Sequence, residues 1–155
     1  MADLTKMIVV PMDGSKNELR SLDYLNLIFG PRHNLDVTLF YVLSSLPPIP
    51  LEEQGMNRES RLQVKSVEEQ NIRMAERILR EAKVALVRKG FEKGRVKTLY
   101  KRRKVGTARD ICMWADDNRA DSVLISTRGR SRLQAFLWGK SLGSYWNIVR
   151  FARFG

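Results

Sequence analysis

The sequence has very few residues of the types that usually carry catalysis or bind metal: one cysteine, Cys112, and one histidine, His33. A lone cysteine cannot form an internal disulfide, which fits a reducing compartment, so we expect a cytoplasmic protein. His33 and Cys112 lie far apart in the chain, and no catalytic triad or metal-ligand cluster can be assembled around them. We therefore expect no catalytic residues and no protein-bound metal, and we interpret Cys112 as a small buried residue.

Long apolar runs are also missing, since none approaches the roughly 20 residues of a membrane-spanning helix. The opening Met-Ala-Asp-Leu-Thr-Lys lacks the pattern of a secretory signal, so we expect no membrane partner. Acidic residues are outnumbered by 28 Lys and Arg to 17 Asp and Glu, which gives a net charge of +11. Such a charge attracts anions, and nucleotides and nucleic acid both fit it.

The 155 residues predict one domain, residues 1–155, which is either a whole protein or part of a longer tandem protein. Apolar runs rich in β-branched residues predict strands at Met7–Met12, Val37–Leu43, Val96–Tyr100 and Ser122–Ile125. Helical spacing predicts helices at Ser15–Phe29, at Val67–Lys89, from Thr107, and from Gly139 to about Phe151. The alternation indicates an α/β fold, a doubly wound parallel sheet with helices on both faces.

The apolar residues of each predicted helix indicate the face that is buried against the sheet. In the first helix these are Leu19, Leu22, Leu25, Ile28 and Phe29; in the second, Ile72, Ala75, Leu79, Ala82 and Leu86; in the third, Ile111, Trp114 and Ala115. Ser15 and Glu18 have the spacing of a capping box, so the first helix is expected to begin at Ser15. Residues 44–65, with three prolines, are expected to form a long polar connection.

Two strand ends carry the residue types that hold phosphate in α/β proteins. The first strand runs into Asp13-Gly14-Ser15, and the fourth runs into the basic, hydroxyl-rich segment Ser126-Thr127-Arg128-Gly129. Gly139, Lys140 and Ser141 follow at what is predicted to be a helix start, where free N–H groups and the helix dipole favour an anion. If the two strands are neighbours where the strand order reverses, Asp13 and this segment face each other across a ligand crevice.

These same segments resemble the universal stress protein family, and the resemblance covers nearly the whole chain. Residues 8–15 are similar to the first strand and Asp-Gly-Ser turn of that family, and residues 120–131 are similar to its fourth strand and loop. Members that bind ATP carry Gly, two residues, Gly, nine residues, Gly, and then Ser or Thr. Gly129 and Gly139 match the second and third glycines, whereas Ser126 replaces the first and Lys140 replaces the Ser or Thr.

The resemblance implies an adenine-nucleotide alpha-hydrolase-like fold with ATP in the crevice beside strands one and four, alone or with Mg²⁺. By position, Asp13 would meet the ribose or adenine, Val42 would meet the adenine through its backbone, and the glycine motif would surround the ribose and phosphates. The implied nucleotide-binding residues are Pro11, Asp13, Gly14, Ser15, Val42, Ser126, Thr127, Arg128, Gly129, Gly139, Lys140 and Ser141.

The C-terminus departs from the family pattern. The family continues from its last helix into a fifth strand, an apolar run after a proline, which often mediates dimer contact. Here the chain ends Arg-Phe-Ala-Arg-Phe-Gly. We therefore expect strand order 3-2-1-4 with the fifth strand missing, and an uncovered edge that favours a homo-oligomer or another protein partner.

Several of these signals also have a simpler structural interpretation. Asp13 alone would more often close a turn or cap a helix, and Gly129 alone is as often an ordinary turn residue. Gly139-Lys140-Ser141 is similar to the end of a Walker A loop, but residue 134 is Gln instead of the required Gly, which argues against a P-loop. The run Lys101–Lys104 is more often a solvated strand end than a nucleic-acid contact.

The sequence thus favours a non-enzymatic, nucleotide-binding regulatory domain of the stress-response type, with slow ATP hydrolysis left open. One alternative is a universal stress protein that does not bind ATP and acts as a protein interaction module. A second alternative is a basic nucleic-acid-binding protein that uses Lys101–Lys104 and the arginines at 128, 130 and 132.

Overall fold

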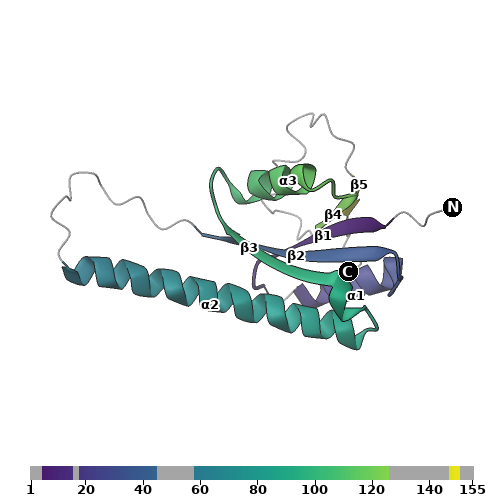
Figure 1. The fold of residues 1–155 in the computed structure, drawn as a ribbon, viewed down its shortest axis with the longest axis horizontal. Helices are drawn as coiled ribbons and strands as arrows, with labels where there is room; N and C mark the ends of the chain where they lie inside the picture. Colours follow the sequence, from purple (N-terminus) through teal and green to yellow (C-terminus); the bar gives the residue numbers. More distant parts are fainter. Residues whose placement is uncertain (1–4, 16–17, 45–57, 126–146, 151–155) are drawn as a thin grey trace, which may run out of the picture.

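The computed structural model describes residues 5–15, 18–44, 58–125 and 147–150. Strands and helices alternate along the chain, as the sequence pattern predicts (Figure 1). In chain order the elements are β1 (Lys6–Met12), α1 (Glu18–Phe29), β2 (Leu35–Leu43), α2 (Arg58–Arg88), the short 3-10 helix η1 (Lys93–Arg95), β3 (Val96–Arg102), α3 (Thr107–Asp117), β4 (Ser122–Ile125) and β5 (Asn147–Arg150).

The strands form one parallel sheet in the order β3-β2-β1-β4-β5. The predicted order 3-2-1-4 is therefore confirmed. β1 pairs with β2 on one side, with Met12 opposite Tyr41, and with β4 on the other, with Val9 opposite Val123. The chain thus moves outward from β1 in one direction and then returns to add strands on its other side, which places the reversal of strand order at β1 and β4.

The fifth strand is present, so the prediction that it is missing is wrong. Residues 147–150 pair in parallel with β4, with Ile148 opposite Val123. We expected these residues in the helix predicted from Gly139 to about Phe151, but the adjacent β-branched pair Ile148-Val149 favours a strand. The sheet edge on this side is therefore β5, while the rest of the predicted helix lies outside the described residues.

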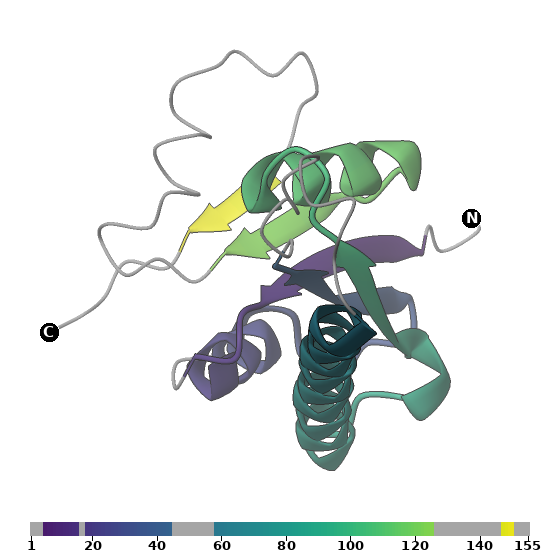
Figure 2. The same cartoon turned by 90° about the vertical axis from the view of Figure 1, so that its left-hand side faces the viewer.

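Helices α1 and α2 cover one face of the sheet and α3 covers the other (Figure 2). Leu22 and Leu25 of α1 are buried in the core on the α1–α2 side, as predicted. Leu19 and Ile28 are 61% and 40% exposed, which corrects their assignment to the inner face. Three residues fall about 60° short of a full helical turn, so residues spaced three apart drift around the helix. Over this stretch the drift places Leu19 on one side of the buried stripe and Ile28 on the other.

Helix α2 is longer than predicted, and its N-terminal part extends past the sheet (Figure 1). Four of the five predicted core residues are buried, Ala75, Leu79, Ala82 and Leu86, while Ile72 is partly buried. Residues 58–65 belong to this helix and not to a polar connection. Most of these residues are good helix formers. Because they are polar, they show no apolar stripe, and the sequence pattern therefore did not indicate a helix. Residues 45–57 lie outside the described part.

The opposite face of the sheet packs against α3. Its core consists of Val9, Phe40, Ile111, Ala115 and Val123. The ring of Trp114 lies 5.3 Å from the ring of Phe40, centroid to centroid. The predicted inner face of α3 and its start at Thr107 are thus confirmed.

Candidate functional site

The predicted binding residues at the end of β1 lie where the strand order reverses. Pro11 belongs to β1, and Asp13, Gly14 and Ser15 follow it directly. Val9 lies opposite Val123, so Pro11 and the last residue of β4, Ile125, are level with each other, each two residues further along. The carboxyl ends of β1 and β4 are therefore adjacent at one edge of the sheet, which is the arrangement that the sequence predicted.

Other predicted site residues cannot be placed. Ser126, Thr127, Arg128, Gly129, Gly139, Lys140 and Ser141 lie outside the described residues. The described half of the candidate site is the end of β1, its turn, and the end of β2.

Asp13 shapes the turn that leaves β1. The backbone N–H of Ser15 donates a hydrogen bond of 2.9 Å to Oδ1 of Asp13, which is the geometry of an Asx turn. The simpler interpretation of Asp13, that it closes a turn, is therefore correct. The Asp13 side chain is exposed at the carboxyl end of β1. Helix α1 is described from Glu18. Residues 16–17 lie outside the described part of the chain, so the predicted capping box at Ser15 stays a prediction.

Gly14 is required by the turn for two separate reasons. Its φ is +75°, in the left-handed region that residues with a Cβ adopt at a cost. A Cβ added at this position would also lie 2.9 Å from Cδ1 of Ile78 in α2. The sequence singled out Gly14 as a binding residue, and the structure adds that the turn carrying Asp13 packs closely on α2.

Replacing Gly14 by alanine is expected to lower the free energy of unfolding by about 1–2 kcal/mol, from left-handed strain and the close contact with Ile78. Urea denaturation measures this loss. Gly94→Ala is the matched control, because an added Cβ at Gly94 meets no atom within 4 Å. That control is expected to be neutral or slightly stabilising, since alanine restricts the unfolded chain. Equal effects of the two substitutions would contradict this role of Gly14.

The carboxyl end of β2 lies beside that of β1 and forms the next part of the candidate site. The pairing of β1 with β2 ends at Met12 and Tyr41, so Val42 and Leu43 extend beyond β1 while still pairing with β3. The Val42 side chain is partly buried and packs against the core on the α3 side. The backbone of Val42, which the family resemblance implies as an adenine contact, thus lies just beyond the end of β1.

The basic segment Lys101–Lys104 lies at this carboxyl edge, two strands away from Asp13. Its four residues are exposed, and β3 ends at Arg102, so the prediction of a solvated strand end is confirmed. Oδ2 and Oδ1 of Asp110 accept hydrogen bonds from the N–H groups of Lys104 (2.7 Å) and Val105 (3.2 Å). Arg102 forms an ion pair with Glu68 of α2. These contacts hold a positive strand end in a fixed place.

The lone cysteine and the lone histidine lie in different surroundings. Cys112 is buried in α3, and burial, with the nearby carboxylate of Asp116, raises the pKa of its thiol. A protonated, buried thiol is a poor nucleophile. His33 is exposed. Within the described ranges, no three metal-binding side chains gather, and the helices lack an apolar stretch that could span a bilayer.

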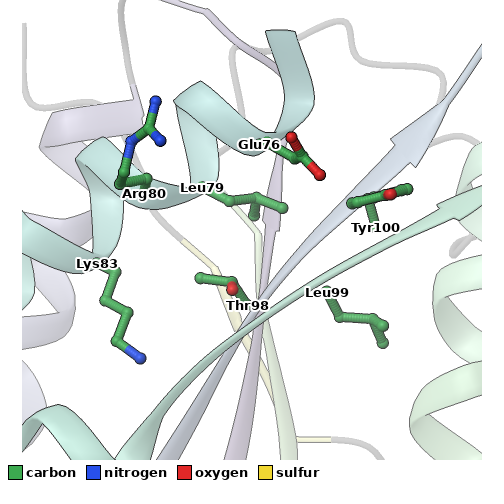
Figure 3. A pocket seen from close by; sticks show the side chains of 7 residues that line it. All are labelled: Glu76, Leu79, Arg80, Lys83, Thr98, Leu99 and Tyr100. Carbon is green, nitrogen blue, oxygen red and sulfur yellow. The ribbon is translucent and has the colours of Figure 1, made fainter. Parts of the chain in front are cut away.

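A groove between α2 and β3 was not predicted from the sequence. It has a volume of about 590 Å³ and is lined by Glu76, Leu79, Arg80, Lys83, Thr98, Leu99 and Tyr100 (Figure 3). It lies along the outer strand of the sheet, away from the β1–β4 crevice. The available signal was the spacing of residues 76, 80 and 83, which places three charged side chains on one helix stripe.

Known structures share this architecture at low sequence identity. The chain is similar to the universal stress protein UspA from Lactobacillus plantarum (14% identity, TM-score 0.69, covering 96% of this chain and 99% of that one). It is also similar to a universal stress protein family protein from Arabidopsis thaliana with AMP bound (15%, 0.65, 96% and 92%). A third is the universal stress protein from Archaeoglobus fulgidus in complex with dAMP (19%, 0.58, 94% and 94%).

No curated protein sequence gives a significant match. The sequence profile of the universal stress protein family, in contrast, matches residues 5–145, which includes the β1 turn, the whole of β4 and the glycine motif. The strand order, the reversal at β1 and the position of Asp13 agree with that match. This chain therefore belongs to the universal stress protein family.

Proposed function

We propose that this chain binds ATP as a regulatory ligand in the crevice at the carboxyl ends of β1 and β4. The observation that carries this proposal is the position of β1 between β2 and β4, because ligands of open parallel sheets bind where the strand order reverses. Structural neighbours with AMP or dAMP bound support an adenine nucleotide. The net charge of +11 further favours an anionic ligand.

The described residues fit one end of a nucleotide. In this proposal the carboxylate of Asp13 accepts hydrogen bonds from ribose hydroxyls, and the backbone of Val42, just beyond the end of β1, contacts the adenine. Pro11, Gly14 and Ser15 would form the floor of this half. The bound nucleotide supplies the charged phosphates, and a Mg²⁺ ion would neutralise part of that charge.

The phosphate half of the site rests on the sequence motif. Ser126, Thr127, Arg128 and Gly129 follow β4 directly, and Gly139, Lys140 and Ser141 complete the motif. Glycine permits close approach of backbone N–H groups to phosphate oxygens. The serine that replaces the first glycine offers a hydroxyl, and the lysine that replaces the Ser or Thr offers a cation. In this proposal, the chemistry is binding, and none of these residues serves as a nucleophile.

The regulatory role follows from binding without catalysis. ATP in the crevice would change the surface at the carboxyl edge of the sheet, which a second copy of the chain or another protein in the cytoplasm could recognise. If ATP does not bind, the same fold acts as a ligand-free interaction module. The experiment on nucleotide binding therefore decides between these two functions.

Two measurements on the full chain test the proposal. Mass spectrometry of freshly purified, denatured protein is expected to show co-purified ATP. ATP with Mg²⁺ at about 100 times its dissociation constant is expected to raise the free energy of unfolding by about 2.7 kcal/mol, seen as a higher melting temperature. Inorganic triphosphate is the control, because it lacks the adenosine that Asp13 and Val42 would contact. The absence of any shift at millimolar ATP would support the ligand-free module.

A nucleic-acid-binding function is the second candidate, favoured by the exposed segment Lys101–Lys104. Binding of this type depends on released counterions and falls steeply with salt. Binding of duplex DNA or RNA that weakens steeply between low and physiological salt, and that is lost when Lys101 and Lys104 are replaced by Gln, would support it. ATP binding with no such nucleic-acid binding would reject it.

A further inference from the structure

The outer edge of β3 is open in the described part of the chain. β3 is the first strand of the sheet order, with β2 on one side and no described strand on the other. The N–H of Arg103 donates to the carbonyl of Leu43 in β2 at 3.0 Å. Because backbone groups alternate in direction along a strand, those of Lys101 and Leu99 also point to β2. The N–H and C=O groups of Thr98, Tyr100 and Arg102 therefore point outward and are available to a further strand.

The groove of about 590 Å³ runs beside this edge. Figure 3 shows Glu76, Arg80 and Lys83 on α2 above the strand, with Thr98 and Tyr100 on β3 and Leu79 between them. The side chains of Thr98 and Tyr100 belong to the same residues whose backbone groups point outward. A strand that paired with this edge would place alternate side chains in the groove, as in other cases of strand addition.

The charged side chains beside the outer edge of β3 indicate what kind of segment would bind there. Arg80 and Lys83 line the groove, and Lys97 and Lys101 are exposed on β3. Within the described ranges, these four cations form no ion pair. Glu76 is the single acidic residue of the groove lining. The edge is therefore complementary to acidic side chains.

The same charges argue against pairing between two copies of this chain. When two β3 strands pair antiparallel with Leu99 opposite Leu99, Lys97 of each copy faces Lys101 of the other, and like charges on facing strands are destabilising. A strand whose carboxylates face the groove would instead meet Arg80 and Lys83. The lysines thus disfavour self-association and favour a specific class of partner.

We propose that the open edge of β3, together with the α2–β3 groove, binds an extended acidic segment of another protein, which adds to the sheet as a strand beside β3. Backbone hydrogen bonds to Thr98, Tyr100 and Arg102 would provide affinity. Arg80 and Lys83 would select carboxylates. This proposal does not depend on nucleotide binding, because the edge lies on the far side of β2 from the β1–β4 crevice.

The first test uses a labelled peptide of about ten residues with alternating Glu and Val, a length that matches an ordinary strand. Fluorescence anisotropy with the full chain is expected to show binding, whereas the same peptide with Lys in place of Glu is not expected to bind. The double variant Arg80→Glu, Lys83→Glu is expected to weaken binding at least about tenfold.

The matched control is Arg77→Glu, Arg88→Glu. It makes the same change in net charge on exposed residues of α2 that do not line the groove. Its effect on peptide affinity is expected to stay below about twofold, the small change of a charge outside the contact. Equal losses in both double variants would overturn the proposal, since binding would then follow overall charge alone.

The second test distinguishes strand addition from general attraction of charges. In amide hydrogen exchange, the N–H groups of Thr98, Tyr100 and Arg102 are expected to become protected when the Glu-Val peptide binds. Those of Leu99 and Lys101 already face β2 and are expected to change little. Peptide binding without this alternating protection would overturn the proposal, as would displacement of a second copy of the chain from the same edge in sedimentation analysis.

Discussion

Replacing Gly129 by valine is expected to weaken ATP binding at least about 100-fold, which corresponds to about 2.8 kcal/mol. Gly129 is the second glycine of the family motif and follows the end of β4 by four residues. A glycine lets backbone N–H groups approach a phosphate, whereas valine adds a branched Cβ in that space. Isothermal titration calorimetry with ATP and Mg²⁺ measures the loss.

Gly94→Val is the control for this substitution. Gly94 lies in η1, before β3, where an added Cβ would meet no atom within 4 Å. The control is expected to retain full ATP affinity, and both variants are expected to retain the melting temperature of the unliganded protein. Unchanged affinity in Gly129→Val would refute the assignment of the phosphate site, even if ATP binds elsewhere on the chain.

Replacing Phe40 by alanine is expected to cost about 3–5 kcal/mol of unfolding free energy. Phe40 is 1% exposed in the centre of β2 and packs against Trp114 of α3. Its removal would leave a cavity in the smaller of the two cores, where few other side chains can move in. Urea unfolding, followed by fluorescence of the tryptophans, measures the change.

Two further variants separate the cavity from general effects of mutation. Phe40→Leu keeps most of the apolar volume and is expected to cost less than about 1.5 kcal/mol. Leu27→Ala removes an apolar side chain that is 79% exposed on α1, with an expected cost below about 0.5 kcal/mol. A loss in Phe40→Ala no larger than in Leu27→Ala would show that α3 is not held to the sheet by this contact.

Much of the fold was predictable because the parallel sheet is buried on both faces. Continuous apolar runs then identify the strands, and helical spacing identifies faces such as Ile111, Trp114 and Ala115 on α3. The alternation of strands and helices predicted the doubly wound parallel sheet, and the family resemblance implied the order 3-2-1-4 that the structure has. The core therefore carries its own signal in the sequence.

The errors occur where elements are short or project from the core. β5 has four residues, too few for a period of two to stand out from a helical pattern. The first two turns of α2 extend past the sheet and bury little, so no apolar stripe marked them as helix. Leu19 and Ile28 are each three residues from a buried leucine of α1, which looks like helical spacing. Because three residues are less than a full helical turn, both side chains lie outside the buried stripe and are exposed.

The candidate site was predictable at the β1 turn and not beyond it. Asp13-Gly14-Ser15 stands directly after an obvious strand, so its position at the carboxyl edge follows from topology alone. The α2–β3 groove could not be found in this way, because it depends on the angle at which a helix crosses an edge strand. No short motif encodes that angle.

The closeness of Gly14 to Ile78 connects the β1 turn with the helix that lines the α2–β3 groove. The turn that carries Asp13 rests against Ile78, and the next residues of the helix, Leu79 and Arg80, belong to the groove lining. Cδ1 of Ile78 is the end of that side chain, so a shift of the turn acts there first and reaches the helix only where the side chain cannot give way. If a bound nucleotide moves this segment of the helix, it changes the affinity for an acidic peptide at β3, and by thermodynamic reciprocity the peptide then changes nucleotide affinity by the same factor.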